Sequence, residues 1–329
     1  MASKKILVLK LGALGDMLMA TPAISAICEQ HREDETWLFT SSDFVSLFSS
    51  WPGLQVKGMA RSGFRAACKS IGWIRAQGFD QIYDLQSNDR SRLYCMLSGS
   101  GEIVGNHDRW PYTIHPGESY RGQCHISEWH KNVLQAAGVA VGTHSPWLPE
   151  TAEGKEKVAK WLESQGLAGE QLVLMHAGAS PGRPEKRWPY YRELAQKIEA
   201  AGARVVWLGS DAELETNRQL SRSAGIDASG LFSISELVEL GRHAAFSVTN
   251  DSGPMHALSC AGTAVYSLFG PSDWTRNHAI GQQDHVVALN KTNALWQATD
   301  FTREQAADLG QISADMLWAL LLKEKRIET

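Results

Sequence analysis

The sequence predicts an α/β protein with two domains, each built around a parallel sheet. At 329 residues the chain is too long for one ordinary hydrophobic core, and two domains of about 150 to 180 residues are expected. Short runs of aliphatic and β-branched residues alternate with helical patterns along the chain, which is typical of βα units around a parallel sheet. A break with two prolines near the middle separates the two series of units.

The strand pattern is clearest in six segments. They are continuous apolar runs, which suits central strands that helices cover on both faces. In chain order they are Ile6–Leu9, Gln81–Leu85, Leu172–His176, Arg204–Leu208, Phe246–Thr249 and Ala264–Phe269. The first two fall in one predicted domain and the other four in the second.

The domain boundary is predicted between residues 146 and 170. Pro146 and Pro149 interrupt the pattern, and a helical stretch over Ala152–Gln165 follows before the next strand. We therefore assign residues 1–155 to the first domain and residues 156–329 to the second.

Two helices of the second domain are readable from the sequence. Ser233 and Glu236 have the S-x-x-E spacing of a capping box, which predicts a helix leading into the strand at Phe246–Thr249. The last helix is predicted over Ile312–Lys325, with an apolar face that should pack on a core. That core could belong to its own domain or, if the helix crosses back, to the first domain.

Composition and charge exclude several classes of protein. Residues 1–150 carry 14 basic and 14 acidic side chains and the remainder carries 18 and 22, so neither half has the basic excess of a nucleic-acid binder. The five cysteines show no C-x-x-C or Cys/His metal pattern and are expected to be reduced in the cytosol. We expect no secretory signal, and no apolar run approaches the roughly 20 residues that span a bilayer. Any membrane contact would be peripheral.

The first motif is the turn Lys10–Asp16, which follows the first strand. Gly12 and Gly15 permit a tight turn into a helix, but the G-x-G-x-x-G spacing of a dinucleotide site is missing. Asp16 follows the carboxyl end of a parallel strand, where ligands bind in α/β folds. Its carboxylate could be a general base or could cap the following helix, and the sequence leaves both open. Pro22 could either begin the regular helix or kink it.

The second motif follows the strand Leu172–His176. Small residues up to Ser180 let a ligand approach the backbone, and Lys186 and Arg187 supply cations that suit a diphosphate. The alternative is an ordinary loop with two solvated cations.

The third motif is Thr249–His256, a strand end that turns into a helix. A glycine and a proline begin the helix, whose first free amides can bind an anion, and Ser252 and His256 add a hydroxyl and a ring nitrogen. Alternatively, Asp251 only caps the helix and His256 is a core histidine. The turn Leu268–Ser272 follows another strand and either borders the same site or only turns the chain.

A basic stripe is predicted in the first domain. Arg61, Arg65 and Lys69 recur every four residues, and on a helix they share one face. The stripe could bind a phosphorylated acceptor or could be a solvated helix surface.

In this order and spacing, the segments resemble glycosyltransferase family 9, the heptosyltransferases that build the inner core of bacterial lipopolysaccharide. The resemblance spans nearly the whole chain and implies the GT-B architecture, in which two Rossmann-like domains face each other across a cleft. The N-terminal domain is then implied to bind the acceptor and the C-terminal domain the nucleotide sugar. The segments that carry it are ILVLKLGALGDMLMATPAISAI, FDQIYDLQSNDRSRL, HAGASPGRPEKRWP, TNDSGPMHALSCAG, SLFGPSD and QISADMLWALLLKEK.

The resemblance also implies roles for single residues. Asp16 is implied to deprotonate the acceptor hydroxyl, and Lys186 to hold the donor diphosphate. Glu213 falls where the family's acidic residue binds the ribose hydroxyls, although a surface glutamate at a helix start fits the sequence equally well. The residues implied to contact phosphate and donor sugar are Asp251, Ser252, Gly253 and His256.

The implied activity is a single inverting displacement that moves heptose from ADP-heptose to a lipopolysaccharide core acceptor. We expect no cofactor, and no D-x-D motif or Cys/His cluster indicates a metal, although Asp251 leaves one carboxylate that a metal could use. The enzyme is expected in the cytoplasm, with peripheral contact to the inner membrane as an option. Three alternatives stay open: another nucleotide-sugar enzyme, such as an epimerase or a transferase with a different donor; an NAD-dependent oxidoreductase; and a regulatory protein that lost the chemistry.

Overall fold

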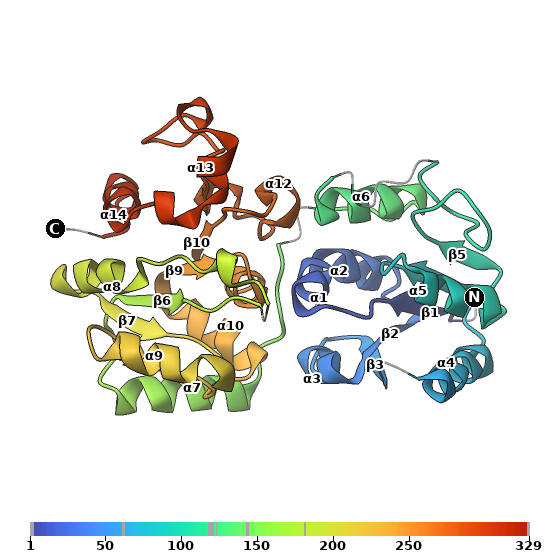
Figure 1. Ribbon diagram of the computed structural model, residues 1–329. Coiled ribbons are helices and arrows are strands. Elements are labelled where there is room, and N and C mark those ends of the chain that lie inside the picture. Colours follow the sequence, from blue (N-terminus) through green and yellow to red (C-terminus); the bar gives the residue numbers. More distant parts are fainter. Residues whose placement is uncertain are drawn as a thin grey trace. The chain divides into compact units, whose positions relative to one another are not determined.

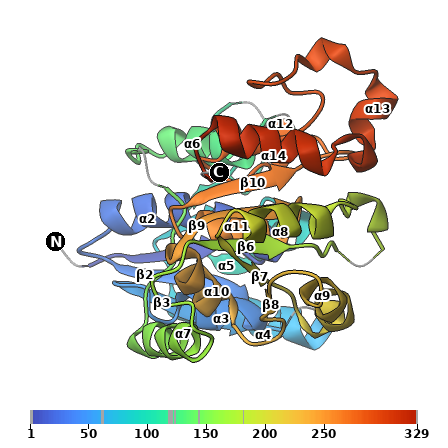
Figure 2. The same cartoon turned by 90° about the vertical axis from the view of Figure 1, so that its left-hand side faces the viewer.

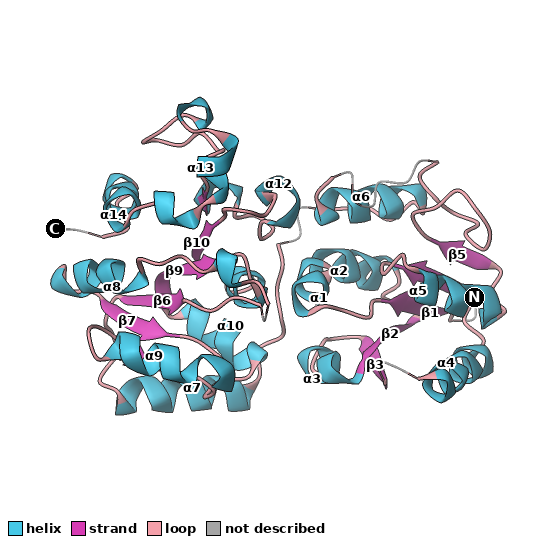
Figure 3. Ribbon diagram, in the orientation of Figure 1, coloured by secondary structure: helices cyan, strands magenta, loops and turns pink. Residues whose placement is uncertain are grey.

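The chain divides into two compact units, Met1–Pro149 and Glu150–Thr329, each with its own sheet and helices (Figure 1). The computed structural model describes residues 3–60, 63–117, 122, 124–142, 145–180 and 182–327. Both sheets are wholly parallel and carry helices on their faces (Figure 3). The predicted α/β fold class is therefore confirmed.

The first unit contains a five-stranded sheet in the order β3-β2-β1-β4-β5. The strands are β1 Lys5–Leu9, β2 Glu35–Ser41, β3 Leu54–Met59, β4 Gln81–Asp84 and β5 Glu102–Val104. Strand β1 lies at the centre of the sheet, so its residues from Ile6 to Leu9 are fully buried. This position explains why the first strand reads as an unbroken apolar run.

Helices cover both faces of this sheet. They are α1 Leu14–Met19, α2 Thr21–Gln30, α3 Val45–Phe48, α4 Phe64–Gln77, α5 Asp89–Ser98 and α6 Ile126–Ala136, with a short 3-10 turn, η1, at Ser42–Phe44. Helices α4 and α5 pack against each other and share one core cluster with Leu7 and Leu9, so they cover the same face. Pro22 lies in the first turn of α2, so it begins this helix and does not kink it.

The second unit contains a six-stranded sheet in the order β11-β10-β9-β6-β7-β8. The strands are β6 Leu172–His176, β7 Arg204–Trp207, β8 Ile226–Asp227, β9 Ala244–Asn250, β10 Ala264–Leu268 and β11 Val286–Val287. Strands β6 and β9 are neighbours at the centre, although 67 residues separate their ends (Figure 2). All four strands predicted for this half are confirmed, and the two unpredicted ones are two-residue edge strands.

The helices of the second unit also occupy both faces, with α8 opposite α7 and α10 (Figure 1). They are α7 Ala152–Ser164, α8 Tyr191–Ala200, α9 Leu214–Ser221, α10 Ile234–Arg242, α11 Gly253–Ser259, α12 Trp274–Asn277, α13 Arg303–Ala307 and α14 Ala314–Lys323. The 3-10 turns are η2 Pro184–Lys186, η3 Asp211–Glu213, η4 Gln283–His285, η5 Ala298–Asp300 and η6 Leu309–Gln311. The predicted capping box begins α10: Ser233 N donates to Glu236 Oε2 at 2.7 Å, and Glu236 N donates to Ser233 Oγ.

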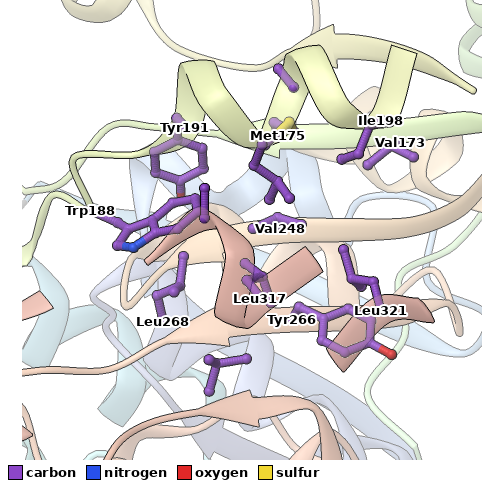
Figure 4. Close-up of a cluster of buried hydrophobic side chains, with 14 of the residues drawn as sticks. Val173, Met175, Trp188, Tyr191, Ile198, Val248, Tyr266, Leu268, Leu317 and Leu321 are labelled. Carbon is purple, nitrogen blue, oxygen red and sulfur yellow. The ribbon is translucent and has the colours of Figure 1, made fainter. Parts of the chain in front are cut away.

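The closing helix α14 packs on the core of its own unit. Leu317 and Leu321 lie against Tyr266 of β10 and near α8, as Figure 4 shows. The helix begins two residues later than predicted because Ser313 caps it, its Oγ accepting from Met316 N.

Candidate functional site

In the first unit, the turn after β1 is fixed by its neighbours. Gly12 has φ +99°, and a Cβ there would overlap the Phe44 ring, so this position requires glycine. Leu11 N donates to Gln86 Oε1 at 2.9 Å, and Ser41 Oγ donates to Leu11 O at 3.0 Å. Contacts from the ends of β2 and β4 therefore hold the backbone that leads into α1.

Asp16 lies in the first turn of α1 and does not cap it. The N-cap position belongs to Ala13, and no side chain caps this helix. Asp16 is partly exposed and forms no hydrogen bond or ion pair with any residue in the described part of the chain. The helix-cap interpretation of Asp16 is therefore wrong.

In the second unit, the segment that follows β6 (the second motif) and the segment that follows β9 (the third motif) meet at the carboxyl ends of the strands. His176 of β6 is in register with Thr249 of β9, and Asn250 is in register with Leu268 of β10. Because the three strands are parallel and adjacent, the segments that follow them lie together. This is the edge at which α/β sheets bind ligands.

The closest contact between the two motifs is an ion pair. Lys186 Nζ donates to Asp251 Oδ2 at 2.6 Å, and the two side chains are only 17% and 11% exposed. A pair this well shielded from water interacts strongly, and removing one partner leaves a charge that water solvates poorly. The structure thus brings together two of the predicted donor-binding residues.

The remaining residues of the third motif lie around the start of α11. Ser252 occupies the N-cap position, so Asp251 does not cap this helix. Ser252 Oγ lies 3.3 Å from Nδ1 of His176, and burial lowers the pKa of His176 to about 4, so this ring is neutral near pH 7. His256 is buried in the same helix, which begins at Gly253.

Asn250 is a site residue to which the sequence assigned no role. Its side chain is fully buried; Nδ2 donates to Ala177 O at 3.1 Å and Gly178 O at 2.9 Å, and Oδ1 accepts from Trp188 N at 3.1 Å. One amide therefore connects the end of β9 to both segments of the second motif. The sequence did contain a signal for this role, because a polar residue at the end of a buried central strand is expected to be hydrogen-bonded.

Replacing Asn250 by alanine should lower the free energy of unfolding by about 2 to 4 kcal/mol, because two carbonyls and one amide of the backbone lose their partner. Urea unfolding measures this loss, and hydrogen exchange should show faster amides over residues 184–188. Asn217→Ala is the matched control, since Asn217 is also fully buried and bonds Leu208 O and Ser229 Oγ. Equal exchange over residues 184–188 in both variants would contradict the assigned connection.

Glu213 lies beside the same loops and also begins a turn. Its carboxylate accepts from Ser210 N at 2.8 Å and from Ser210 Oγ, which forms a capping box on η3. A Cβ on Gly178 would lie 2.7 Å from Glu213 Oε1, and a Cβ on Gly209 would lie 2.8 Å from Glu213 Cβ. Two glycines thus make room for this glutamate at the end of the sheet. Glu213 can therefore begin a turn and still be the acidic residue that binds ribose hydroxyls.

The basic stripe of the first unit borders a cavity. Arg65 and Lys69 lie on α4 beside a space of about 360 Å³ between this helix and the end of β3, whereas Arg61 falls outside the described residues. Lys57 of β3 adds a third cation to the lining, with its Nζ 5.6 Å from the centre of the Trp73 ring. Sequence periodicity along one helix could not reveal Lys57, because it comes from a neighbouring strand.

In the described part of the chain, no three His, Cys, Asp or Glu side chains are grouped so that they could hold a metal ion. Over the same ranges, no helix has both the length and the apolar character needed to cross a bilayer.

A family model described as glycosyltransferase family 9 (heptosyltransferase) matches residues 69–307. Lipopolysaccharide heptosyltransferase 2 of Escherichia coli K12 is 31% identical over 238 residues, which are 66% of this chain and 67% of that protein.

Two solved structures share the fold over almost the whole chain. The glycosyl transferase family 9 protein of Veillonella parvula DSM 2008 matches with a TM-score of 0.82 at 20% identity, over 97% of this chain and 96% of that one. The E. coli ADP-heptose lipopolysaccharide heptosyltransferase II matches with a TM-score of 0.72 at 21% identity, over 98% and 99%. These likenesses confirm the GT-B fold.

Proposed function

The chain belongs to glycosyltransferase family 9, the heptosyltransferases, and from this premise we propose that it moves heptose from ADP-heptose to a saccharide of the lipopolysaccharide core. The solved E. coli neighbour is named for ADP-heptose and lipopolysaccharide, and the E. coli relative is named for lipopolysaccharide. The N-terminal unit would bind the acceptor and the C-terminal unit the donor.

The observation that carries the proposal is the pairing of Lys186 with Asp251 at the end of β9. An ammonium group held at this edge can bind the donor diphosphate and stabilise the negative charge that develops on it as the glycosidic bond breaks. Ser252 and His256 would contact phosphate and donor sugar, and the Glu213 carboxylate would accept hydrogen bonds from the ribose hydroxyls. With Lys186 in this role, transfer proceeds without a metal ion.

The reaction would be a single displacement with inversion at the anomeric carbon. Asp16 takes the proton of the acceptor hydroxyl, whose oxygen forms a bond to the anomeric carbon while the bond from that carbon to the diphosphate oxygen breaks and ADP leaves. Asp16 suits this step because no described residue pairs with its carboxylate. Lys57, Arg65 and Lys69 around the cavity of the first unit would bind acidic groups of the acceptor, and Arg61 is proposed to join them.

A mass-spectrometric screen tests the proposal. ADP-heptose and several nucleotide hexoses are incubated with truncated lipopolysaccharide acceptors, and the expected result is addition of one heptose, with inversion at the anomeric centre and release of ADP. Epimerised nucleotide sugar in reactions that lack acceptor would instead support an epimerase. Saturable NADH binding without any response to ADP would support an oxidoreductase.

A further inference from the structure

One face of the second sheet is polar near the carboxyl ends of its strands. His176 of β6 is in register with Thr249 of β9, which in turn is in register with Ser267 of β10. Residues in register point to the same face of a parallel sheet, and Ser247, two residues before Thr249, points there as well. We call these four residues the polar row. The opposite face of the same strands packs in the apolar core (Figure 4).

The three hydroxyls of the polar row lower the stability of the fold. Ser247, Thr249 and Ser267 are fully buried, and among the described residues their hydroxyls have no hydrogen-bond partner. Such hydroxyls have lost water without gaining another partner, so an apolar side chain of similar shape would stabilise the sheet more. Polar residues that reduce stability and gather at the ligand-binding end of a parallel sheet indicate a functional role for this face.

His176 is the member of the polar row that contacts a residue of the proposed donor site. Its Nδ1 lies 3.3 Å from Ser252 Oγ, and this oxygen lies 3.2 Å from Asn250 O. The ring is buried and forms no other hydrogen bond with the described residues. Burial keeps the pKa of His176 at about 4, although the carboxylate of Glu213 favours the charged ring. Near pH 7 the ring is therefore neutral, with one nitrogen that donates and one that accepts.

The direction of the single hydroxyl proton of Ser252 depends on which ring nitrogen carries hydrogen. A carbonyl oxygen and an ionised phosphate oxygen can only accept a hydrogen bond. If Nδ1 carries the hydrogen, it donates to Ser252 Oγ, and the serine proton is available for Asn250 O or for a phosphate. If Nε2 carries it instead, the serine proton points to the bare Nδ1 and is not available for a ligand. Binding of a phosphate by Ser252 therefore requires hydrogen on Nδ1 of His176.

We propose that His176 is a positioning residue of the donor site, whose Nδ1–H donates to Ser252 Oγ and directs the serine proton toward a diphosphate oxygen. The inference rests on the proposed function, in which Ser252 contacts phosphate, and it adds a residue that acts through Ser252. A histidine that only filled space in the core would not affect ligand binding through one particular nitrogen. This difference makes the role testable.

Two substitutions of His176 distinguish its nitrogens. Asparagine places an amide nitrogen close to the position of Nδ1, whereas glutamine places its amide close to Nε2. The full chain is titrated with ADP in a calorimeter, without acceptor. His176→Asn should bind ADP within about twofold of the wild type, and His176→Gln should bind it about threefold to tenfold more weakly, the usual contribution of a neutral hydrogen bond. Both variants lose the ring, so their thermal midpoints should fall by similar amounts.

A double-mutant cycle tests whether His176 acts through Ser252. In a Ser252→Ala background, His176→Gln should change the ADP affinity by less than about twofold, because the hydroxyl that the ring positions is missing. Ser267→Ala is the matched control, since it removes a buried hydroxyl of the polar row from β10, a strand that carries none of the proposed donor-binding residues. This control should keep the ADP affinity of the wild type and should not lower the thermal midpoint.

Equal ADP affinity of His176→Asn and His176→Gln would overturn the inference, whether both bind normally or both bind weakly. Additive effects of His176→Gln and Ser252→Ala would overturn it as well, since His176 would then act by another route. If the wild type fails to bind ADP, the proposed function fails together with this inference. If the wild type binds ADP and transfers heptose while the two His176 variants behave equally, only the role of His176 is rejected.

Discussion

Replacing Asp16 by asparagine should lower the rate of sugar transfer by a factor of about 10² to 10⁴, the usual contribution of a general base. The amide keeps the shape of the carboxylate but cannot accept a proton from the acceptor hydroxyl. Steady-state kinetics at saturating donor and acceptor would show the loss in kcat. Binding of ADP, measured by calorimetry, should be unchanged because the predicted nucleotide site lies in the other unit.

Asp108→Asn provides the control for this experiment. Asp108 is an exposed aspartate of the same unit, in the loop after β5. The Asp108→Asn variant should transfer sugar at the wild-type rate. Near wild-type kcat in Asp16→Asn would show that another group is the base, and equal loss of ADP binding would show that the substitution disturbs more than proton transfer.

Replacing Lys186 by glutamine should weaken ADP binding by about 10-fold to 100-fold, since a hydrogen bond to a charged group contributes about 1.5 to 3 kcal/mol. The substitution has two effects: it removes the cation that is proposed to bind the diphosphate, and it leaves Asp251 without its partner 2.6 Å away. An unpaired carboxylate there repels the ligand. Both effects act in the same direction.

A double-mutant cycle separates the two effects. Asp251→Asn in the Lys186→Gln background should recover part of the lost ADP affinity, because it removes the repulsive charge. Lys157→Gln is the matched control, because Lys157 pairs with Glu236 at 2.9 Å elsewhere in the same unit. Unchanged ADP affinity in Lys186→Gln would exclude this lysine from the donor site.

Most interior strands were predicted and the edge strands of the first sheet were not; β2, an interior strand between β3 and β1, was also missed. Strands such as β1 and β6 are buried on both faces, so their sequences are almost wholly apolar. Edge strands β8 and β11 span two residues each and leave no periodic pattern. Helix ends differ from the prediction by one or two residues where a cap such as Ser313 decides the boundary.

The sequence also predicted which residue types form the candidate site, but it did not predict which of these residues contact each other. Lys186 and Asp251 were each predicted from a local motif, but their ion pair joins residues 65 positions apart. This ion pair forms because β6 and β9 are neighbours in the sheet. No single segment of sequence indicates the order of the strands in a sheet. For the same reason, the sequence did not predict that Lys57 lines the cavity of the first unit, because Lys57 and Arg65 come from different elements.

The fit of Glu213 between two glycines restricts how this protein can vary among its relatives. A side chain at position 178 or 209 would occupy the space that the glutamate fills. Position 178 is therefore expected to change together with position 213: chains that keep the acidic residue should keep Gly178, and chains that lose it are free to carry alanine or serine there. Gly209 is expected to persist in both cases, because a Cβ there would also lie 2.7 Å from Asn217 Nδ2 and 2.8 Å from the Cβ of residue 213. Covariation across many relatives would record the acid and Gly178 as one inherited pair.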